Sequence, residues 1–155
     1  MLLEEGGAQG IGGEPPRLEN PEINLKSYKA LTKAIQSGLV RTAHDCSEGG
    51  IAVAIAEMCI GGRCGAAIDV DGPGGADLWG RLWGESLGRI IVGVASSKSA
   101  AFKEMMLGNE ITYLGETTDS DTLRIYDADE TIIESNVLEM TSVWKGALDM
   151  TGGNE

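Results

Sequence analysis

The chain has 155 residues, about the size of one ordinary domain, and 24 acidic residues against 12 Lys and Arg give it a formal net charge of −12. A protein that neutralises nucleic-acid phosphates or docks on an anionic membrane needs clustered cations, so we expect neither activity. The three cysteines, Cys46, Cys59 and Cys64, form no C-x-x-C pair. This pattern argues against a disulfide framework or a structural zinc site. Because the sequence also shows no signal peptide and no long apolar run, we predict a soluble, cytoplasmic protein.

The N-terminal part is rich in Gly and Pro and shows no clear period. We interpret residues 1–24 as an extended lead-in, the remnant of a truncated domain start. Asn24 is then a plausible N-cap for a helix that ends at Gly38. Its expected apolar face consists of Tyr28, Leu31, Ala34 and Ile35.

The rest of the chain alternates between strand-like and helix-like segments. Residues 50–60 are apolar on nearly all sides and predict a buried helix, while residues 89–95 are a β-branched run typical of a buried strand. The other expected elements are strands at 39–43, 64–70 and 111–118, helices at 76–83, 98–107 and 135–150, a loop at 71–75, and a hairpin at 122–135. We therefore predict an α/β (α+β) domain over residues 25–150, with a mixed sheet packed by helices, and a frayed tail at 151–155.

The first motif, HDCSEGG at residues 44–50, lies between a strand and the start of a helix. A helix N-terminus offers unpaired N–H groups to an anion, and Gly49 and Gly50 let the backbone approach a phosphate. Ser47 can add a hydroxyl donor, and Asp45 can hold a magnesium ion or bind a ribose or base. An ordinary cap explains the same residues: Ser47 caps the helix, Glu48 favours its dipole, and the glycines turn the chain.

His44 and Cys46 belong to the same motif and have two interpretations. On a strand they share one face, so a catalytic Cys–His pair is one of them. A hydrogen-bonded structural histidine beside an inert thiol is the interpretation we favour, since no partner base is evident.

The second motif, WGESLGR at residues 83–89, follows a predicted helix and precedes the predicted buried strand. Glu85 and Ser86 in a glycine-rich turn can hold a magnesium–phosphate unit. A helix C-cap and turn, with Arg89 on a solvated edge, is the alternative, and it is the better interpretation of Gly88. Because loops of open α/β sheets gather at one edge, we hypothesise that the two motifs meet.

The run AHDCSEGGIAVAIAEM, followed by LWGESLGRIIVGV, resembles the C-terminal domain of phosphoribosylformylglycinamidine synthase. That enzyme belongs to the aminoimidazole ribonucleotide synthetase-like superfamily, and the resemblance runs from about Gly12 to Trp144. It implies an ATP-dependent ligase of purine biosynthesis. Such an enzyme makes formylglycinamidine ribonucleotide from formylglycinamide ribonucleotide, ATP and glutamine-derived ammonia.

Matching the motifs carries family roles onto particular residues. The resemblance implies that Glu85 binds Mg2+ and that the nucleotide or substrate phosphate is bound by Asp45, Ser47, Glu48, Gly49, Gly50, Gly84 and Ser86. Leu87 departs from the polar residue often seen there, so no side-chain contact is carried over to it. His44 does not match the family's catalytic histidine, which belongs to the N-terminal domain.

The resemblance also implies partners: the N-terminal synthetase domain of the same protein, a glutaminase subunit, a small accessory subunit and the ribonucleotide substrate. On this interpretation the fragment is inactive alone. Two alternatives remain open. One is another superfamily member, such as a small-molecule kinase or a selenophosphate synthetase-like enzyme, and the other is a non-catalytic phosphate-binding module.

Overall fold

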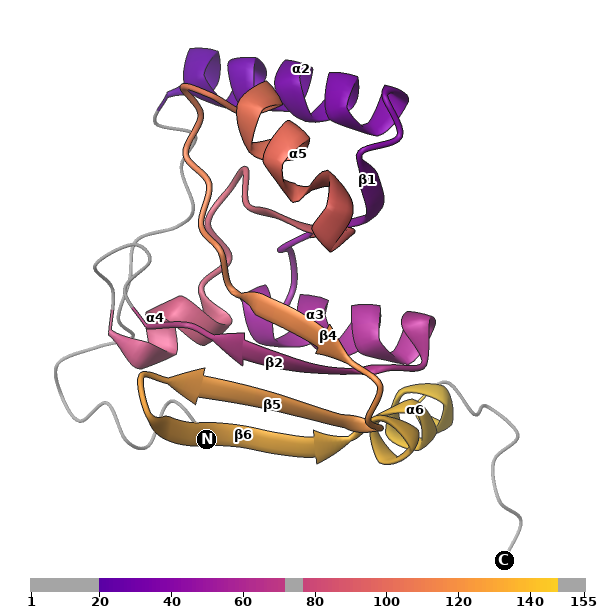
Figure 1. The fold of residues 1–155 in the computed structure, drawn as a ribbon. Helices are drawn as coiled ribbons and strands as arrows, with labels where there is room; N and C mark the ends of the chain where they lie inside the picture. Colours follow the sequence, from indigo (N-terminus) through magenta and orange to yellow (C-terminus); the bar gives the residue numbers. More distant parts are fainter. Residues whose placement is uncertain (1–19, 72–76, 148–155) are drawn as a thin grey trace, which may run out of the picture.

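The structure is a computed structural model that describes residues 20–71 and 77–147. The helices are α2 (Pro21–Gln36), α3 (Gly50–Gly62), α4 (Leu78–Trp83), α5 (Ser99–Met105) and α6 (Val137–Gly146), with a short 3-10 helix η2 (Ser96–Lys98). The strands are β1 (Val40–Asp45), β2 (Gly65–Asp69), β3 (Ile90–Val94), β4 (Gly115–Thr118), β5 (Thr122–Asp127) and β6 (Glu130–Asn136). Figure 1 shows their arrangement.

The larger sheet has four strands in the order β4-β2-β5-β6. β2 runs antiparallel to β4 and parallel to β5, and β5 pairs with β6 in an antiparallel hairpin. Ile68 of β2 lies beside Ile125 of β5, which in turn lies opposite Ile133 of β6. The predicted mixed sheet and the predicted hairpin are both confirmed.

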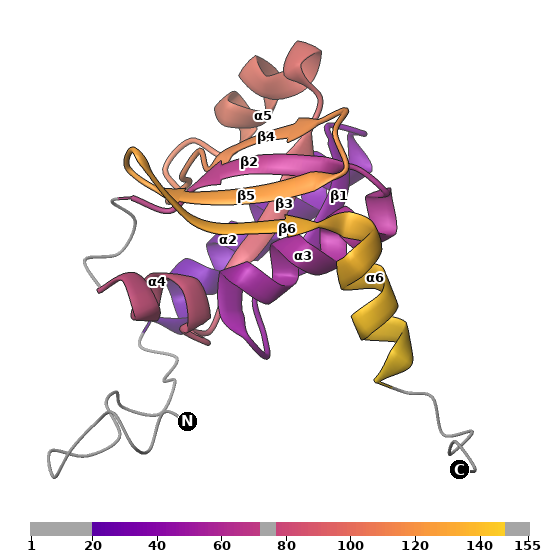
Figure 2. The same cartoon turned by 90° about the horizontal axis from the view of Figure 1, so that it is seen from below.

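The main core lies between this sheet and the helices α3 and α6, which cover one of its faces (Figure 2). The alanines of α3 allow close packing, and Ala54 is 2% exposed. The predicted buried helix is thus confirmed, since six of its residues are buried. The buried members of this core are Cys46, Ile51, Ala52, Ala54, Ile55, Cys59, Ala66, Ile68, Val70, Leu82, Leu123, Ile125 and Val137.

A second, smaller cluster lies where α2 and α5 pack on a two-stranded antiparallel sheet of β1 and β3, away from the four-stranded sheet (Figure 1). Its buried residues are Ala34, Phe102 and Met106, and Val92 and Val94 of β3 pack against them. The segment after β1 reaches the main core through Cys46, and α4 reaches it through Leu82, since both side chains are buried there.

The start of the first helix differs from the prediction. α2 begins at Pro21 with Asn20 as its cap, four residues before the predicted start, so residues 21–24 are helical rather than extended. Proline at the first helical position is a start signal, because its φ suits the helix and its missing N–H is not needed there. The buried residue of α2 is Ala34, whereas Tyr28 and Ile35 are 40% and 47% exposed.

Two strands also differ. β3 was predicted as a buried strand, but each of its residues is only half-buried, since β1 is its one neighbour in the described sheet. β4 begins at Gly115 rather than at residue 111. Gly115 has φ +149°, and a Cβ there would collide with the Ala67 carbonyl of β2, so pairing starts where the chain can approach closely.

The remaining predicted helices and strands are present with shifted ends. The predicted closing helix is α6, on which Val143 and Trp144 are exposed. Most of the predicted 71–75 loop, most of the predicted lead-in and the whole predicted tail lie outside the described residues. None of the helices in the described part of the chain is long and apolar enough to cross a membrane.

Candidate functional site

The first motif turns sharply from β1 into α3. Gly49 and Gly50 have φ of +77° and +62°, the left-handed region that glycine adopts without cost. The N–H of Gly50 donates to the backbone carbonyl of Ser47 at 3.0 Å. The N-cap of α3 is Gly49, with no side-chain hydrogen bond, so the alternative in which Ser47 caps the helix is wrong.

The second motif is a closed loop after α4. Gly84 is the C-cap of α4, and Gly88 turns the chain with φ +88°. The Arg89 guanidinium folds back onto the helix end, donating from Nη1 to the Gly84 carbonyl at 3.0 Å and from Nη2 to the Arg81 carbonyl at 3.2 Å. Arg89 therefore satisfies carbonyls at a helix C-terminus, and the alternative that placed it on a solvated edge is wrong.

The two motifs meet, as hypothesised. The N–H of Gly49 donates to Glu85 Oε1 at 3.0 Å, which puts a carboxylate at the positive end of α3. A Cβ at Gly50 would lie 2.7 Å from the Leu82 carbonyl oxygen and 2.9 Å from that of Gly84. The space left by the missing side chain of Gly50 is thus filled by the backbone of α4.

A third contact joins the motifs through the backbone. The N–H of Cys46 donates to the carbonyl of Arg89 at 2.9 Å, one step beyond the register pair of Asp45 with Ile90. Arg89 consequently touches the first motif with its main chain and the second with its side chain.

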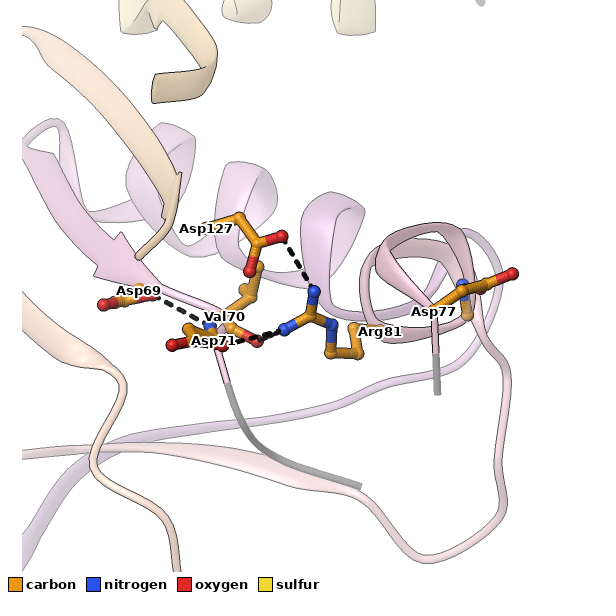
Figure 3. Close-up of polar contacts among 7 residues, drawn as sticks. Asp69, Val70, Asp71, Asp77, Arg81 and Asp127 are labelled. Carbon is orange, nitrogen blue, oxygen red and sulfur yellow. Dashed lines mark hydrogen bonds and ion pairs between the residues drawn. The ribbon is translucent and has the colours of Figure 1, made fainter. Parts of the chain in front are cut away.

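Arg81 anchors the short helix α4 to the sheet (Figure 3). Its side chain is 14% exposed and donates from Nη2 to Asp127 Oδ2 at 2.8 Å. Nη1 donates to the Val70 carbonyl at 3.0 Å and lies 3.4 Å from Asp71 Oδ1. Because β2 and β5 are parallel, their carboxyl ends lie side by side, and Arg81 bonds to residues at both ends.

The start of α4 is capped by Asp77, whose Oδ1 accepts the N–H of Gly80 at 2.8 Å. A helix of six residues needs such support, because helix nucleation is unfavourable. Sequence reasoning missed Arg81 entirely. The aspartates at the ends of the two predicted strands are the feature of the sequence that could have indicated a partner for this arginine.

His44 bonds between β1 and α3. Its Nε2 lies 2.9 Å from Glu57 Oε2, and its Nδ1 lies 2.7 Å from the carbonyl of Asp45. Both ring nitrogens are thus engaged with structural partners, which confirms the predicted hydrogen-bonded role.

Cys46 is buried, and burial raises the pKa of its thiol, with a smaller opposing effect from the Arg89 charge. A raised pKa disfavours the thiolate that a nucleophile needs. The catalytic Cys–His alternative therefore has no support in the geometry.

The remaining predicted side chains lie on the open surface around the contact. Asp45, Ser47, Glu48, Glu85 and Ser86 are all exposed. Within residues 20–71 and 77–147, no three His, Cys, Asp or Glu side chains are grouped to hold a metal ion. Magnesium commonly takes one or two carboxylates plus substrate phosphates, so an exposed Glu85 with one oxygen beyond its bond to Gly49 fits an ion that arrives with a phosphate.

Two surface grooves lie elsewhere on the described part of the molecule. One, of about 300 Å3, is lined by Asp69, Asp71, Tyr113 and Tyr126 among others, and the second, of about 440 Å3, lies between α2 and the end of α5. Neither includes a residue of the two motifs. Because the motif side chains Asp45, Ser47, Glu48, Glu85 and Ser86 are exposed, a ligand at the motif contact would be only partly enclosed by the described residues.

The chain is similar in fold to known proteins. A family described as AIR synthase related protein, C-terminal domain, matches residues 4–128. Phosphoribosylformylglycinamidine synthase II from Thermotoga maritima is 21% identical, with a TM-score of 0.71 over 81% of this chain and 22% of that chain. PurL of that organism complexed with ATP is 22% identical, with a TM-score of 0.65 over 73% of this chain and 20% of that one.

The PurLQS structure from Thermotoga maritima is 21% identical, with a TM-score of 0.69 over 88% of this chain and 24% of that chain. The chain thus spans about a fifth to a quarter of the length of these structures, and at such identities the likeness establishes the fold alone. The family match covers most of the chain, both motifs included. The chain belongs to the family of AIR synthase related proteins, as their C-terminal domain.

Proposed function

We propose that this domain is part of an ATP-dependent amidoligase that makes formylglycinamidine ribonucleotide from formylglycinamide ribonucleotide, ATP and glutamine-derived ammonia. The observation that carries the proposal is the contact of the two motifs through Gly49 and Glu85. Their meeting brings hydroxyls, carboxylates and a helix N-terminus to one place. Hydroxyls and a helix N-terminus are donors that phosphate recognition uses, and carboxylates can take part through a bound Mg2+.

In this proposal the first motif and the N-terminus of α3 receive a phosphate of the nucleotide or of the ribonucleotide. The residues involved are Asp45, Ser47, Glu48, Gly49, Gly50, Gly84 and Ser86. Ser47 and Ser86 would offer hydroxyls, and the phosphate would share the Gly49 N–H with Glu85, to which it donates in this structure, or displace that carboxylate. Gly50 keeps the two backbones close, and Gly84 ends α4 beside it. Fixed donors around a phosphoryl group lower the activation barrier of its transfer, because they hold the group in place and stabilise the charge of the transition state.

Glu85 is the proposed ligand of Mg2+. A magnesium ion bound there would neutralise phosphate charge beside the carboxylates. This matters in a chain of net charge −12, where a bare nucleotide would be repelled. The described residues provide no complete metal cage, so we expect Mg2+ to bind with the nucleotide rather than before it.

The proposed partners are the N-terminal synthetase domain, a glutaminase subunit and a small accessory subunit, in the cytoplasm. The exposure of the motif residues supports a site completed by another domain. The PurLQS structure concerns a related fold and is the comparison that suggests further subunits. In this proposal the catalytic histidine comes from the N-terminal synthetase domain, and this domain supplies the phosphate contacts.

The test is turnover. The chain is combined with the N-terminal half of a phosphoribosylformylglycinamidine synthase, and the product is followed with ATP, Mg2+, ammonia and formylglycinamide ribonucleotide. We expect product from the pair and none from the chain alone. If the pair forms no product but phosphorylates another small molecule, the kinase alternative replaces this proposal. Tight nucleotide binding by the chain alone without any turnover of the pair would favour the binding module.

A further inference from the structure

Arg89 is placed where the two motifs are joined, yet neither motif's expected phosphate contacts include it. Its guanidinium bonds the carbonyls of Arg81 and Gly84 at 3.2 and 3.0 Å. The bond to Gly84 spans five residues and closes residues 84–89 into a loop, and the bond to Arg81 spans eight and ties that loop to α4. The forked guanidinium can make two such bonds at fixed angles, which an ammonium group cannot reproduce.

The loop closed by Arg89 carries Glu85 to the first motif. Glu85 is exposed, and its hydrogen bond is to the N–H of Gly49. An exposed glutamate on a free loop has many rotamers, so the bond to Gly49 depends on where the loop is held. The guanidinium holds one end of that loop at Gly84.

The other end of the loop is held by the main chain of the same residue. The carbonyl of Arg89 accepts the N–H of Cys46, which ties the loop's exit to the first motif. Beneath it, Arg81 fixes α4 to Asp127 and to the Val70 carbonyl at the ends of two parallel strands. A continuous series of polar contacts thus runs from the sheet through Arg81 and Arg89 to Glu85 and Gly49.

We propose that Arg89 is the positioning residue of this site: it does not contact the phosphate, but it sets the loop that places Glu85 against the N-terminus of α3. The inference deepens the function proposed above and takes its catalytic meaning from it. Its geometric part is independent, because the Gly49–Glu85 contact can be observed without any ligand.

The test uses the amide signal of Gly49 in 15N-labelled protein. Glu85→Ala removes the acceptor and defines the shift of a Gly49 amide without its carboxylate. We expect Arg89→Met to move the Gly49 signal to the same position, and Arg89→Lys to move it part of the way. Arg124→Met is the matched control, because Arg124 pairs with Glu134 on the exposed surface of another element and should leave Gly49 unchanged.

The amide signals of the other residues distinguish a local displacement of the loop from a general loss of folding. Positioning predicts shifts confined to residues 44–50 and 80–89, with β5 and β6 unmoved. A Gly49 signal that stays in its wild-type position in both Arg89 variants overturns the inference, and so do shifts of equal size across the whole domain. Should Arg89→Met fail to fold, Arg89→Lys decides by the same criteria.

Nucleotide titration links the result to function. If the wild-type chain binds Mg-ATP, Arg89→Lys should weaken binding about tenfold, because Glu85, the proposed Mg2+ ligand, would no longer be held in place. Unchanged binding in both folded Arg89 variants would contradict the inference. If wild type shows no binding alone or with the N-terminal half, the proposed function fails, and the Gly49 amide still decides the positioning role.

Discussion

Gly49 and Glu85 are 36 residues apart in the chain, and the N–H of one donates to the carboxylate of the other at 3.0 Å. The bond joins the start of α3 to the loop that leaves α4. It also means that a helix N-terminus, the positive end of a dipole, faces an anion supplied by the protein itself. An incoming phosphate at this N–H must share it with Glu85 or displace it.

Gly50→Ala tests the close contact of the two motifs. The alanine would be held at φ +62°, and its Cβ would lie 2.7 Å from the Leu82 carbonyl oxygen. Left-handed backbone costs a non-glycine residue about 1–2 kcal/mol, and overpacking adds a similar amount. We expect a loss of about 2–4 kcal/mol in the free energy of unfolding, measured by urea denaturation.

Gly61→Ala is the matched control in the same helix. Gly61 lies in α3, and a Cβ there would meet nothing within 4 Å. Alanine in a helix is favoured over glycine by about 0.5–1 kcal/mol, so this variant should be slightly more stable than wild type. Equal stability of the two variants would show that Gly50 is not under the stated constraint.

Asp127→Ala tests the anchor of α4. The Arg81 side chain is 14% exposed and Asp127 is 25% exposed, so removing the carboxylate leaves a largely buried guanidinium without its closest anion. We expect a loss of about 2–3 kcal/mol in unfolding free energy. Asp71→Ala removes a carboxylate that is 59% exposed and 3.4 Å from Arg81, and should cost less than about 1 kcal/mol. The reverse order would refute the assignment of Asp127 as the principal partner.

The cysteines should differ in reactivity. Burial, followed by the neighbouring Cys64, raises the pKa of the Cys59 thiol from 9.0 to about 11, and burial also raises the pKa of Cys46. With iodoacetamide at pH 8, mass spectrometry of the native protein should find Cys64 labelled first, since it is the least buried of the three. Labelling of Cys59 at the rate of Cys64 would contradict the described packing.

The raised pKa of Cys59 also predicts a pH dependence of stability. The folded state holds the thiol proton more tightly than the unfolded state, so the stabilisation is complete below about pH 8.5 and is lost as the pH rises through about 11. Compared with Cys59→Ala at each pH, wild type should lose about 1–2 kcal/mol of its relative stability between pH 8 and pH 11. A difference that stays constant over that range would count against the burial of this thiol.

His44 is expected to matter for stability and not for ligand binding. Its Nε2 lies 2.9 Å from Glu57 Oε2 in a partly exposed pair. A double-mutant cycle of His44→Gln and Glu57→Gln should give a coupling energy of about 0.5–1 kcal/mol, with nucleotide affinity within about twofold of wild type. A large loss of nucleotide binding in His44→Gln alone would contradict this expectation and show that the histidine takes part in ligand binding.

Local patterns predicted much of the fold. The apolar run of α3, the β5–β6 hairpin and the glycine turns of both motifs are properties of short segments. The Asn20–Pro21 start of α2 was equally local and was missed. Its sequence signal was present, but Asn24 offered a competing cap.

Non-local features were not predictable. Which face of α2 is buried depends on α5, which selects Ala34 over Tyr28. The half-exposed state of β3 follows from a sheet that has only β1 beside it among the described strands. Arg89 was misplaced because its acceptors are backbone carbonyls, which leave no trace in the sequence. Arg81 was missed because its pairing with Asp127 joins segments 46 residues apart.

The most direct test of the account is an NMR titration of the 15N-labelled chain with Mg-ATP, followed amide by amide. The account predicts that the shifts concentrate in residues 45–50 and 84–86, that they vanish in Gly50→Ala, and that they persist in Gly61→Ala. Shifts centred instead on the groove between α2 and α5, around Lys26, Lys29 and Lys33, would contradict it. So would equal shifts of the two motifs in wild type and Gly50→Ala.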